Sequence, residues 1–179
     1  MKKIISIIVV LFIIIMEYNN FSFEKNMEEG KQAIKNEKFT EAKKLFEAAV
    51  DKKSDSREAL ALYKQTDKLI EVIELEKDGY YEEAMDLCQN INNIHSEDNL
   101  IQTLANNLKN EYTEKLQEVS QYEESLNARL TEGKALVASF DYESAKTIFT
   151  EIIEEIKNTE IYYLQLAEAQ EYLSICEGN

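Results

Sequence analysis

Few residues of this chain have side chains that could carry out chemistry, and their spacing argues against a catalytic or metal site. His95 is the one histidine, and it lies in a polar stretch, where a surface side chain is a better interpretation than a general base. Zinc sites need about four clustered ligands, which one histidine and the distant Cys88 and Cys176 do not supply. No glycine-rich phosphate loop is present, and no run of carboxylates has calcium-loop spacing. We therefore expect no enzyme activity, no metal and no cofactor.

The cysteines and several glutamates have structural interpretations. Cys88 is expected to be buried as a small hydrophobic residue. A disulfide with Cys176 is chemically allowed outside the membrane, but the spacing does not require one. Four glutamates stand at expected helix starts, where carboxylates suit the positive end of the helix dipole: Glu41, Glu82, Glu83 and Glu143.

Composition predicts an all-α fold. The 179 residues suit one compact domain or one short stack of repeats, and 44% of them are hydrophobic. There is no proline and there are four glycines, too few for the turns of a sheet protein, so the helices should be long. The net charge of −15 argues against nucleic acid as a partner and against flat adsorption on anionic lipid.

The N-terminal segment, residues 1–23, is expected to be a signal or anchor with a short connector. Lys2 and Lys3 precede an apolar run over residues 4–16, which as a helix spans about 20 Å and suits a secretion signal. Residues 17–20 form a poor cleavage site, so we expect an uncleaved membrane anchor, with secretion after cleavage as the alternative. The lysines leave the N-terminus in the cytoplasm and place the rest outside. The bias toward isoleucine, lysine and asparagine is typical of AT-rich bacterial genomes.

Apolar periodicity predicts seven further helices after a connector at residues 17–25. Asp55, with Glu58 reaching back, is expected to cap the third segment, Ser96 the fifth and Asp141 the sixth. The fifth is the longest, because an apolar stripe runs through it almost without a break. The predicted segments cover residues 25–36, 40–50, 57–77, 81–91, about 98–138, 143–156 and 161–176, the last of which would cover the open end of a stack.

A short pattern occurs three times along these segments. In two copies, glycine is followed at equal spacing by an aromatic residue, alanine and phenylalanine: Gly30, Phe39, Ala42 and Phe46, then Gly133, Tyr142, Ala145 and Phe149. The middle copy has Val72 in place of glycine, then Tyr81, Ala84 and Cys88. Each copy is interpreted as a helix, a tight turn and a second helix, in which small residues let two backbones approach closely.

This pattern resembles the tetratricopeptide repeat (TPR) family. The family repeats every 34 residues and closes with proline, whereas the three alanines here lie 42 and 61 residues apart and proline is absent. The resemblance therefore implies an irregular, TPR-like stack of antiparallel helical hairpins with elongated helices. It covers about 65 residues closely.

The resemblance also implies a concave groove lined by the first helix of each pair. Positions just after and five after the small residue would face inward, which gives a basic lane with apolar residues between the lysines. Its members are Lys31, Ile34, Lys35, Ile73, Lys77, Lys134 and Val137. Such a lane would suit an acidic peptide or an acidic cell-surface polymer. The alternative is that these lysines are solvated and balanced by nearby glutamates. The lysines after Gly30 and Gly133 do not match the family's chaperone-tail clamp, which needs asparagine there.

The expected function is that of a membrane-tethered or exported scaffold that binds another protein or peptide. An alternative is a self-associating structural protein, because the stripe from Leu104 to Leu130 could pair with its twin as a coiled coil and form a homodimer. An enzyme accessory subunit is the third hypothesis.

Overall fold

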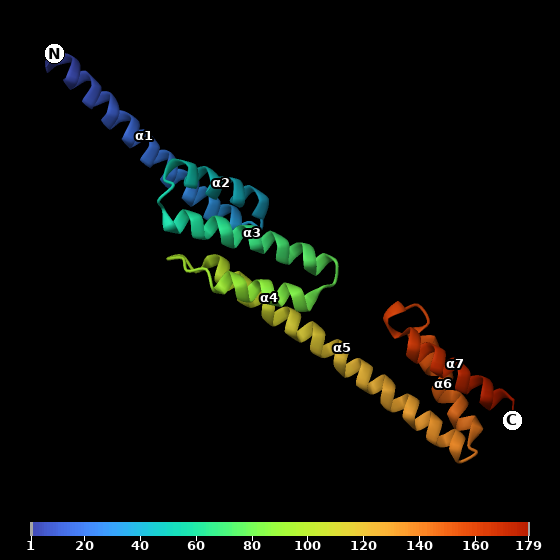
Figure 1. The fold of residues 1–179 in the computed structure, drawn as a ribbon. Coiled ribbons are helices and arrows are strands. Elements are labelled where there is room, and N and C mark those ends of the chain that lie inside the picture. The colour runs from blue at the N-terminus through green and yellow to red at the C-terminus, as the bar shows by residue number, and fades with distance from the viewer. Residues whose placement is uncertain (1, 179) are drawn as a thin grey trace. The chain divides into compact units, whose positions relative to one another are not determined.

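The computed structural model of the chain describes residues 2–178, and the secondary structure in this range is helical (Figure 1). The prediction of an all-α chain with an N-terminal apolar helix is confirmed. Met1 and Asn179, the outermost residues of the predicted segments, lie outside the described residues. The elements are α1 (Lys2–Lys35), α2 (Phe39–Lys52), α3 (Arg57–Lys77), α4 (Tyr81–Asn92), α5 (Leu100–Ala138), α6 (Tyr142–Ile156), the short 3₁₀ helix η1 (Glu160–Tyr162) and α7 (Tyr163–Glu177).

The predicted connector at residues 17–25 is wrong, because α1 continues through it to Lys35. Glu17, Asn19 and Asn20 interrupt the apolar run, but none of them is a proline or glycine that would end a helix. The apolar segment and the first helix of the first pair are therefore one continuous helix.

Three turns with the same backbone geometry follow α1, α3 and α5. In each, one residue takes a left-handed conformation: Glu37 (φ 58°), Gly79 (φ 79°) and Phe140 (φ 65°). The next amide donates to a carbonyl five residues back, at 2.9 Å in all three turns, and the left-handed residue donates three residues back at 3.0 Å. This pair of hydrogen bonds is the Schellman motif, which satisfies the last carbonyls of a helix and reverses the chain.

Helix starts agree with the predictions at one position and differ at two. Asp141 caps α6, since its Oδ1 accepts from the amide of Ser144 at 3.2 Å. At α3 the cap is Ser56, not the predicted Asp55; its Oγ accepts from the amide of Ala59 at 3.2 Å.

The predicted caps at Glu58 and Ser96 are also replaced by other contacts. The Glu58 carboxylate does not reach back to residue 55 but accepts from the amides of Glu97 at 2.6 Å and Asp98 at 3.2 Å. Asp98, not Ser96, accepts from the first amide of α5, that of Leu100, at 2.9 Å. The loop before α5 is thus held by a carboxylate from α3.

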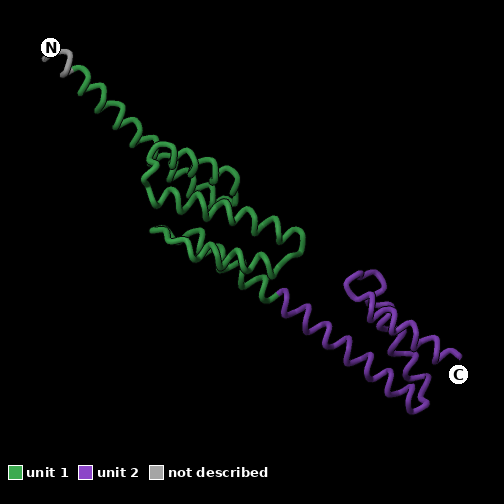
Figure 2. Tube along the Cα trace, viewed as in Figure 1, with its two compact units in different colours: residues 1–114 green, residues 115–179 purple. Residues whose placement is uncertain are grey.

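The chain divides into two compact units, residues 1–114 and residues 115–179, and the boundary lies within α5 (Figure 2). In the first unit α1 packs against α2, α2 against α3, and α3 against α4; in the second unit α6 packs against α7. Each unit has its own apolar core. The sequence pattern predicts one domain over residues 24–179, and no change in composition marks this division.

The repeated small residues lie where helices meet. A Cβ on Gly30 would lie 2.6 Å from a ring carbon of Phe46, and a Cβ on Gly133 would lie 2.6 Å from a ring carbon of Phe149. The three repeat alanines, Ala42, Ala84 and Ala145, are fully buried. The three repeat aromatics at the turns, Phe39, Tyr81 and Tyr142, are partly buried against the two cores.

Both cysteines are buried and free, so the disulfide considered above is not formed. Burial raises the pKa of the Cys88 thiol to about 11 and also raises that of Cys176. A thiol with a raised pKa is a weak nucleophile at neutral pH. The two cysteines therefore behave as small core residues.

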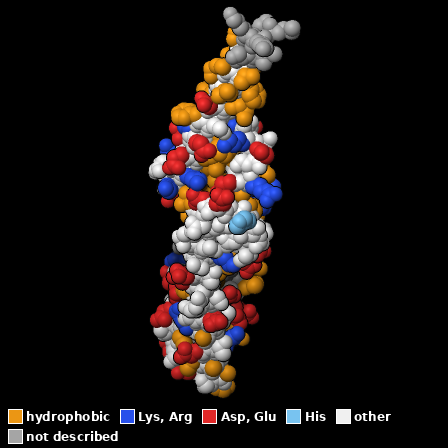
Figure 3. Space-filling view, turned by 90° about the vertical axis from the view of Figure 1, so that its left-hand side faces the viewer, with side chains coloured by type: hydrophobic (Ala, Val, Ile, Leu, Met, Phe, Trp, Pro, Cys, Tyr) orange, Lys and Arg blue, Asp and Glu red, His pale blue; other side chains and the backbone are white. Residues whose placement is uncertain are grey.

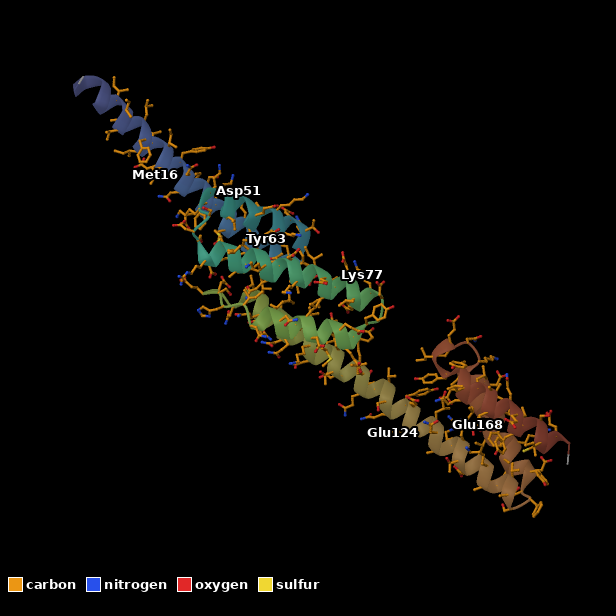
Figure 4. The ribbon with its side chains drawn as sticks, in the orientation of Figure 1. Met16, Asp51, Tyr63, Lys77, Glu124 and Glu168 are labelled. Carbon is orange, nitrogen blue, oxygen red and sulfur yellow. The ribbon has the colours of Figure 1, made fainter. Side chains whose placement is uncertain are left out.

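Helix α1 has two parts with different surroundings. Phe23, Met27 and Ile34 lie in the first core. Upstream, every residue from Ile7 to Met16 is 49–62% exposed, which leaves the helix apolar on all sides. Figure 3 shows hydrophobic side chains gathered there, and Figure 4 labels Met16 on the part of α1 that extends beyond α2. By length and composition this helix could be a membrane anchor or a signal sequence.

Candidate partner-binding groove

The first unit has a groove of about 750 Å³ beside the turn between α1 and α2. The turn, one face of α3 and the start of α5 form its walls. We call this the α3–α5 groove. It is lined by Glu37, Lys38, Phe39, Thr40, Glu41, Ile70, Ile73, Glu74, Lys77, Leu104 and Leu108.

Helical spacing brings the lining residues together. Residues 70, 73, 74 and 77 follow the i, i+3, i+4, i+7 pattern that places side chains on one face of α3. Leu104 and Leu108 are four residues apart and share a face of α5. The left-handed Glu37 reverses the chain so that Phe39, the first residue of α2, reaches the same hollow. Three elements distant in sequence therefore supply one apolar floor.

The floor is apolar and its edge is charged. Five side chains, Phe39, Ile70, Ile73, Leu104 and Leu108, are each half-buried, so part of each remains open to a ligand. The edge carries three carboxylates and two ammonium groups, and one of these pairs, Lys38 with Glu41, lies at 3.6 Å with both side chains well exposed. Such exposed pairs contribute little to stability. The groove thus offers apolar contact inside a slightly acidic edge.

The predicted basic lane is brought together only in part. Ile73 and Lys77 line the α3–α5 groove. Lys35 is exposed in the last turn of α1, two residues before the groove begins. Ile34 is 2% exposed and belongs to the first core, so its predicted place in the groove is wrong.

Lys31 is engaged by a carboxylate. Its Nζ lies 3.0 Å from Oδ2 of Asp98, and about a quarter of each side chain is exposed. Burial alone lowers the pKa of Lys31, but the hydrogen bond and charge of Asp98 outweigh it, so the pKa is raised. For Asp98, burial alone would raise the pKa. The hydrogen bonds from Lys31 and from the Leu100 amide outweigh burial, so the pKa of Asp98 is lowered. The pair ties α1 to the loop before α5.

Lys134 and Val137 lie in the second unit and have local partners. Lys134 donates to Oε1 of Glu168 on α7 at 2.7 Å, and this hydrogen bond raises the pKa of Lys134 above its usual value (Figure 4 labels Glu168). Its Nζ also lies 6.0 Å from the centre of the Tyr172 ring. Val137 packs against the second core. Lys134 therefore ties α5 to α7, Val137 packs in the second unit, and neither residue lines the α3–α5 groove.

Four lining residues have other roles in the sequence pattern. Phe39 marks the repeat, Ile70 belongs to the apolar face of the third helical segment, and Leu104 and Leu108 belong to the long stripe. The spacing of these residues indicates that each one lies on the apolar side of its helix. It does not indicate that the apolar sides of three helices meet incompletely and leave a hollow. Only the packing of α2, α3 and α5 reveals that hollow.

Among the residues that the structure describes, no group of three or more histidine, cysteine or acidic side chains is placed to hold a metal ion. Comparisons with known protein families, with curated proteins and with solved structures give no match.

Proposed function

We propose that this chain is a membrane-tethered helical scaffold that binds a segment of another protein in the α3–α5 groove. The observation that carries the proposal is the groove itself: five half-buried apolar side chains from α2, α3 and α5 around a hollow of about 750 Å³. This volume is in the range of about 300–1,000 Å³ that is usual for ligand sites. Helix α1 supplies the tether and leaves the remaining helices on the outer side of the membrane. If the N-terminal segment is cleaved, the remaining helices are secreted.

The recurrent helical hairpins support a TPR-like stack and, with it, a binding function. The three turns share one backbone geometry, and two of the three hairpins repeat the contact of glycine with phenylalanine. Stacked helical hairpins of this kind use the faces of their first helices to hold peptides. In this chain α3 and α5, which are first helices in that scheme, supply six of the groove residues.

The groove favours a partner segment that is apolar and basic. Its floor accepts apolar side chains spaced along one face of a helix. Its edge carries one more carboxylate than ammonium groups, and the chain as a whole has a net charge of −15, which favours approach of a positively charged partner. The acidic ligand expected from a lysine lane has less support, because Lys31 and Lys134 are paired with carboxylates.

Self-association through the α5 stripe is less favoured. Leu104, Leu108 and Tyr112 pack in or against the first core, and Leu126 and Leu130 are buried in the second. Val119, 45% exposed, is the one large apolar residue of the stripe counted as exposed in the described structure. A coiled coil needs an apolar residue in each turn of the seam. The stripe does not leave such a seam free.

A peptide-display selection against the full chain in detergent micelles tests the proposal. We expect enrichment of segments with apolar residues three or four apart and flanking lysine or arginine. Leu108→Glu should weaken binding of the enriched peptides at least about tenfold, because a charge would enter the apolar floor. Thr103→Glu, an exposed position on the same helix, is the matched control and should bind normally. Equal binding to both variants would exclude the groove, and enrichment of acidic peptides would favour the lysine lane.

A further inference from the structure

The continuous helix α1 fixes how far the first unit lies from a membrane that α1 spans. From Ile4 to Phe21 there are 18 residues, which as a helix rise about 27 Å and match the ~30 Å hydrocarbon layer better than the 13-residue apolar run. Tyr18 and Phe21 are 67% and 71% exposed. Aromatic rings at the end of a spanning helix favour the interface between lipid and water. Glu17 lies about one helical turn from this end, within reach of the headgroups.

The first unit begins immediately after this interface. Phe23 is 7% exposed and is the first residue of α1 in the core. Lys53, in the loop between α2 and α3, has its Nζ 4.1 Å from the centre of the Phe23 ring and 3.7 Å from Oε1 of Glu24. Phe23 lies two positions after Phe21 on the helix, a rise of about 3 Å. The loop therefore lies at the depth of the lipid headgroups when α1 spans the membrane.

We propose that the C-terminal end of α2 and the loop between α2 and α3 form a lipid-contacting surface, in which Lys52, the last residue of α2, and Lys53 bind headgroup phosphates. This rests on the proposed membrane tether. Residues 51–57 carry three basic and two acidic side chains, and Glu24 beside Lys53 adds a third acidic one. This surface is therefore balanced in charge, whereas the whole chain carries 20 basic and 35 acidic side chains. Lys52 and Ser54 are exposed, and Lys53 is partly exposed. This local balance of charge reduces the repulsion that the acidic chain would otherwise meet at an anionic surface.

The contact would set the height of the α3–α5 groove. Lys35, the last residue of α1, lies twelve residues beyond Phe23 on the same helix, a rise of about 18 Å, and the turn at Glu37 follows it. The groove would therefore select protein segments that lie close to the membrane surface. A partner anchored in the same membrane fits this position.

Fluorophores attached to single introduced cysteines in the full chain measure the depth of each site. Ser54→Cys reports the loop, Asp78→Cys reports the opposite end of α3, about 30 Å away, and Met16→Cys reports the tether (Figure 4 labels Met16). Cys88 and Cys176 are buried, and the unsubstituted chain gives their background labelling. The vesicles contain phosphatidylcholine and phosphatidylglycerol with a nitroxide quencher on the headgroup or on the acyl chain.

We expect the headgroup nitroxide to quench the label at residue 54 and not the label at residue 78, and the acyl-chain nitroxide to quench the label at residue 16. Quenching at residue 16 without quenching at residue 54 would overturn the loop contact and leave the tether intact. Absence of quenching at residue 16 would overturn the tether itself.

A charge change tests the lysines separately. Lys52→Gln with Lys53→Gln should reduce headgroup quenching at residue 54 about twofold in phosphatidylglycerol vesicles, because the attraction to phosphate is lost. Lys64→Gln with Lys68→Gln, on α3, is the matched control and should leave it unchanged. Equal quenching in both variants would mean that α1 alone sets the depth, and phosphate binding by the loop would be rejected.

Discussion

The contact of Gly30 with Phe46 makes an unusual prediction for a glycine-to-alanine change in a helix. In an ordinary helix interior this change stabilises by about 1 kcal/mol, because alanine restricts the unfolded chain and favours helix. Here the new Cβ would lie 2.6 Å from one ring carbon of Phe46 and 2.9 Å from two others. The ring is fully buried, so it has little room to move away. The added carbon must therefore displace the α1–α2 packing.

The expected size follows from two opposing effects. Overpacking a close-packed core by one carbon costs about 1–3 kcal/mol, and the gain in helix propensity returns about 1 kcal/mol. Gly30→Ala should thus lower the free energy of unfolding of the first unit by about 1 kcal/mol. For a unit of this size, this corresponds to a fall in melting temperature of about 4–8 °C. Gly133→Ala should behave alike, because its Cβ would lie 2.6 and 2.8 Å from ring carbons of Phe149.

Thermal unfolding followed by circular dichroism, on the full chain in detergent micelles, measures the change. Hydrogen exchange read out by peptide assigns it to one unit. Gly178→Ala is the control, because its nearest atoms would lie at 3.6 Å and 3.8 Å and it should shift nothing. In a Phe46→Leu background, Gly30→Ala should become neutral or stabilising, since the smaller side chain makes room. A raised melting temperature for Gly30→Ala in the natural background would refute the close-packing argument.

Two further predictions concern the turns and one ion pair. Phe140→Gly and Glu37→Gly should each stabilise their unit by about 1 kcal/mol, whereas Gly79→Ala should destabilise its unit by a similar amount, because only glycine takes a left-handed conformation without strain. Urea unfolding measures the free energy of unfolding of all three variants. A destabilised Phe140→Gly variant would show that the Phe140 ring is needed where it lies. The pKa of Asp98 is lowered from its ordinary value of 3.8 in the folded chain, so its contact with Lys31 stabilises above that value and is lost as the pH falls through the lowered pKa. Asp98→Asn should therefore lower stability at neutral pH and flatten its decline in acid, and an unchanged acid profile would contradict this assignment.

The helices and turns were predictable because their causes are local. The absence of proline and the scarcity of glycine leave long helices as the main option, and Asp78-Gly79 and Phe140-Asp141 mark two of the three reversals. The predicted connector at residues 17–25 is wrong because polar residues alone do not interrupt a helix. Asparagine and glutamate end an apolar run, but without glycine or proline they do not end a helix. The continuity of α1 is what brings Phe23 and Lys53 to the end of the apolar segment.

The lysines could not be placed from the sequence because their partners are distant in it. A position on a helix face follows from spacing, but a long side chain takes the direction of its nearest carboxylate. Lys31 pairs with Asp98 from the loop before α5, and Lys134 pairs with Glu168 from α7, 34 residues away. The alternative interpretation, solvated lysines balanced by nearby glutamates, is met only in part, because Lys134 has a glutamate partner, Lys31 has an aspartate partner, and both partners are distant in sequence. Lys77 stays at the groove edge.

The α5 stripe shows a more general limit of periodicity. Apolar residues at helical spacing specify that a face is buried, but not which chain or element covers it. From Leu104 to Leu130 the same pattern fits a coiled-coil dimer and an intramolecular core equally well. Two features decide between them in this chain. Tyr112 is fully buried and donates to Glu76 of α3 at 3.0 Å, and Leu126 is 1% exposed in the second core. A dimer through this stripe would have to open both cores, so the groove beside Leu104 and Leu108 is the better place to look for a partner.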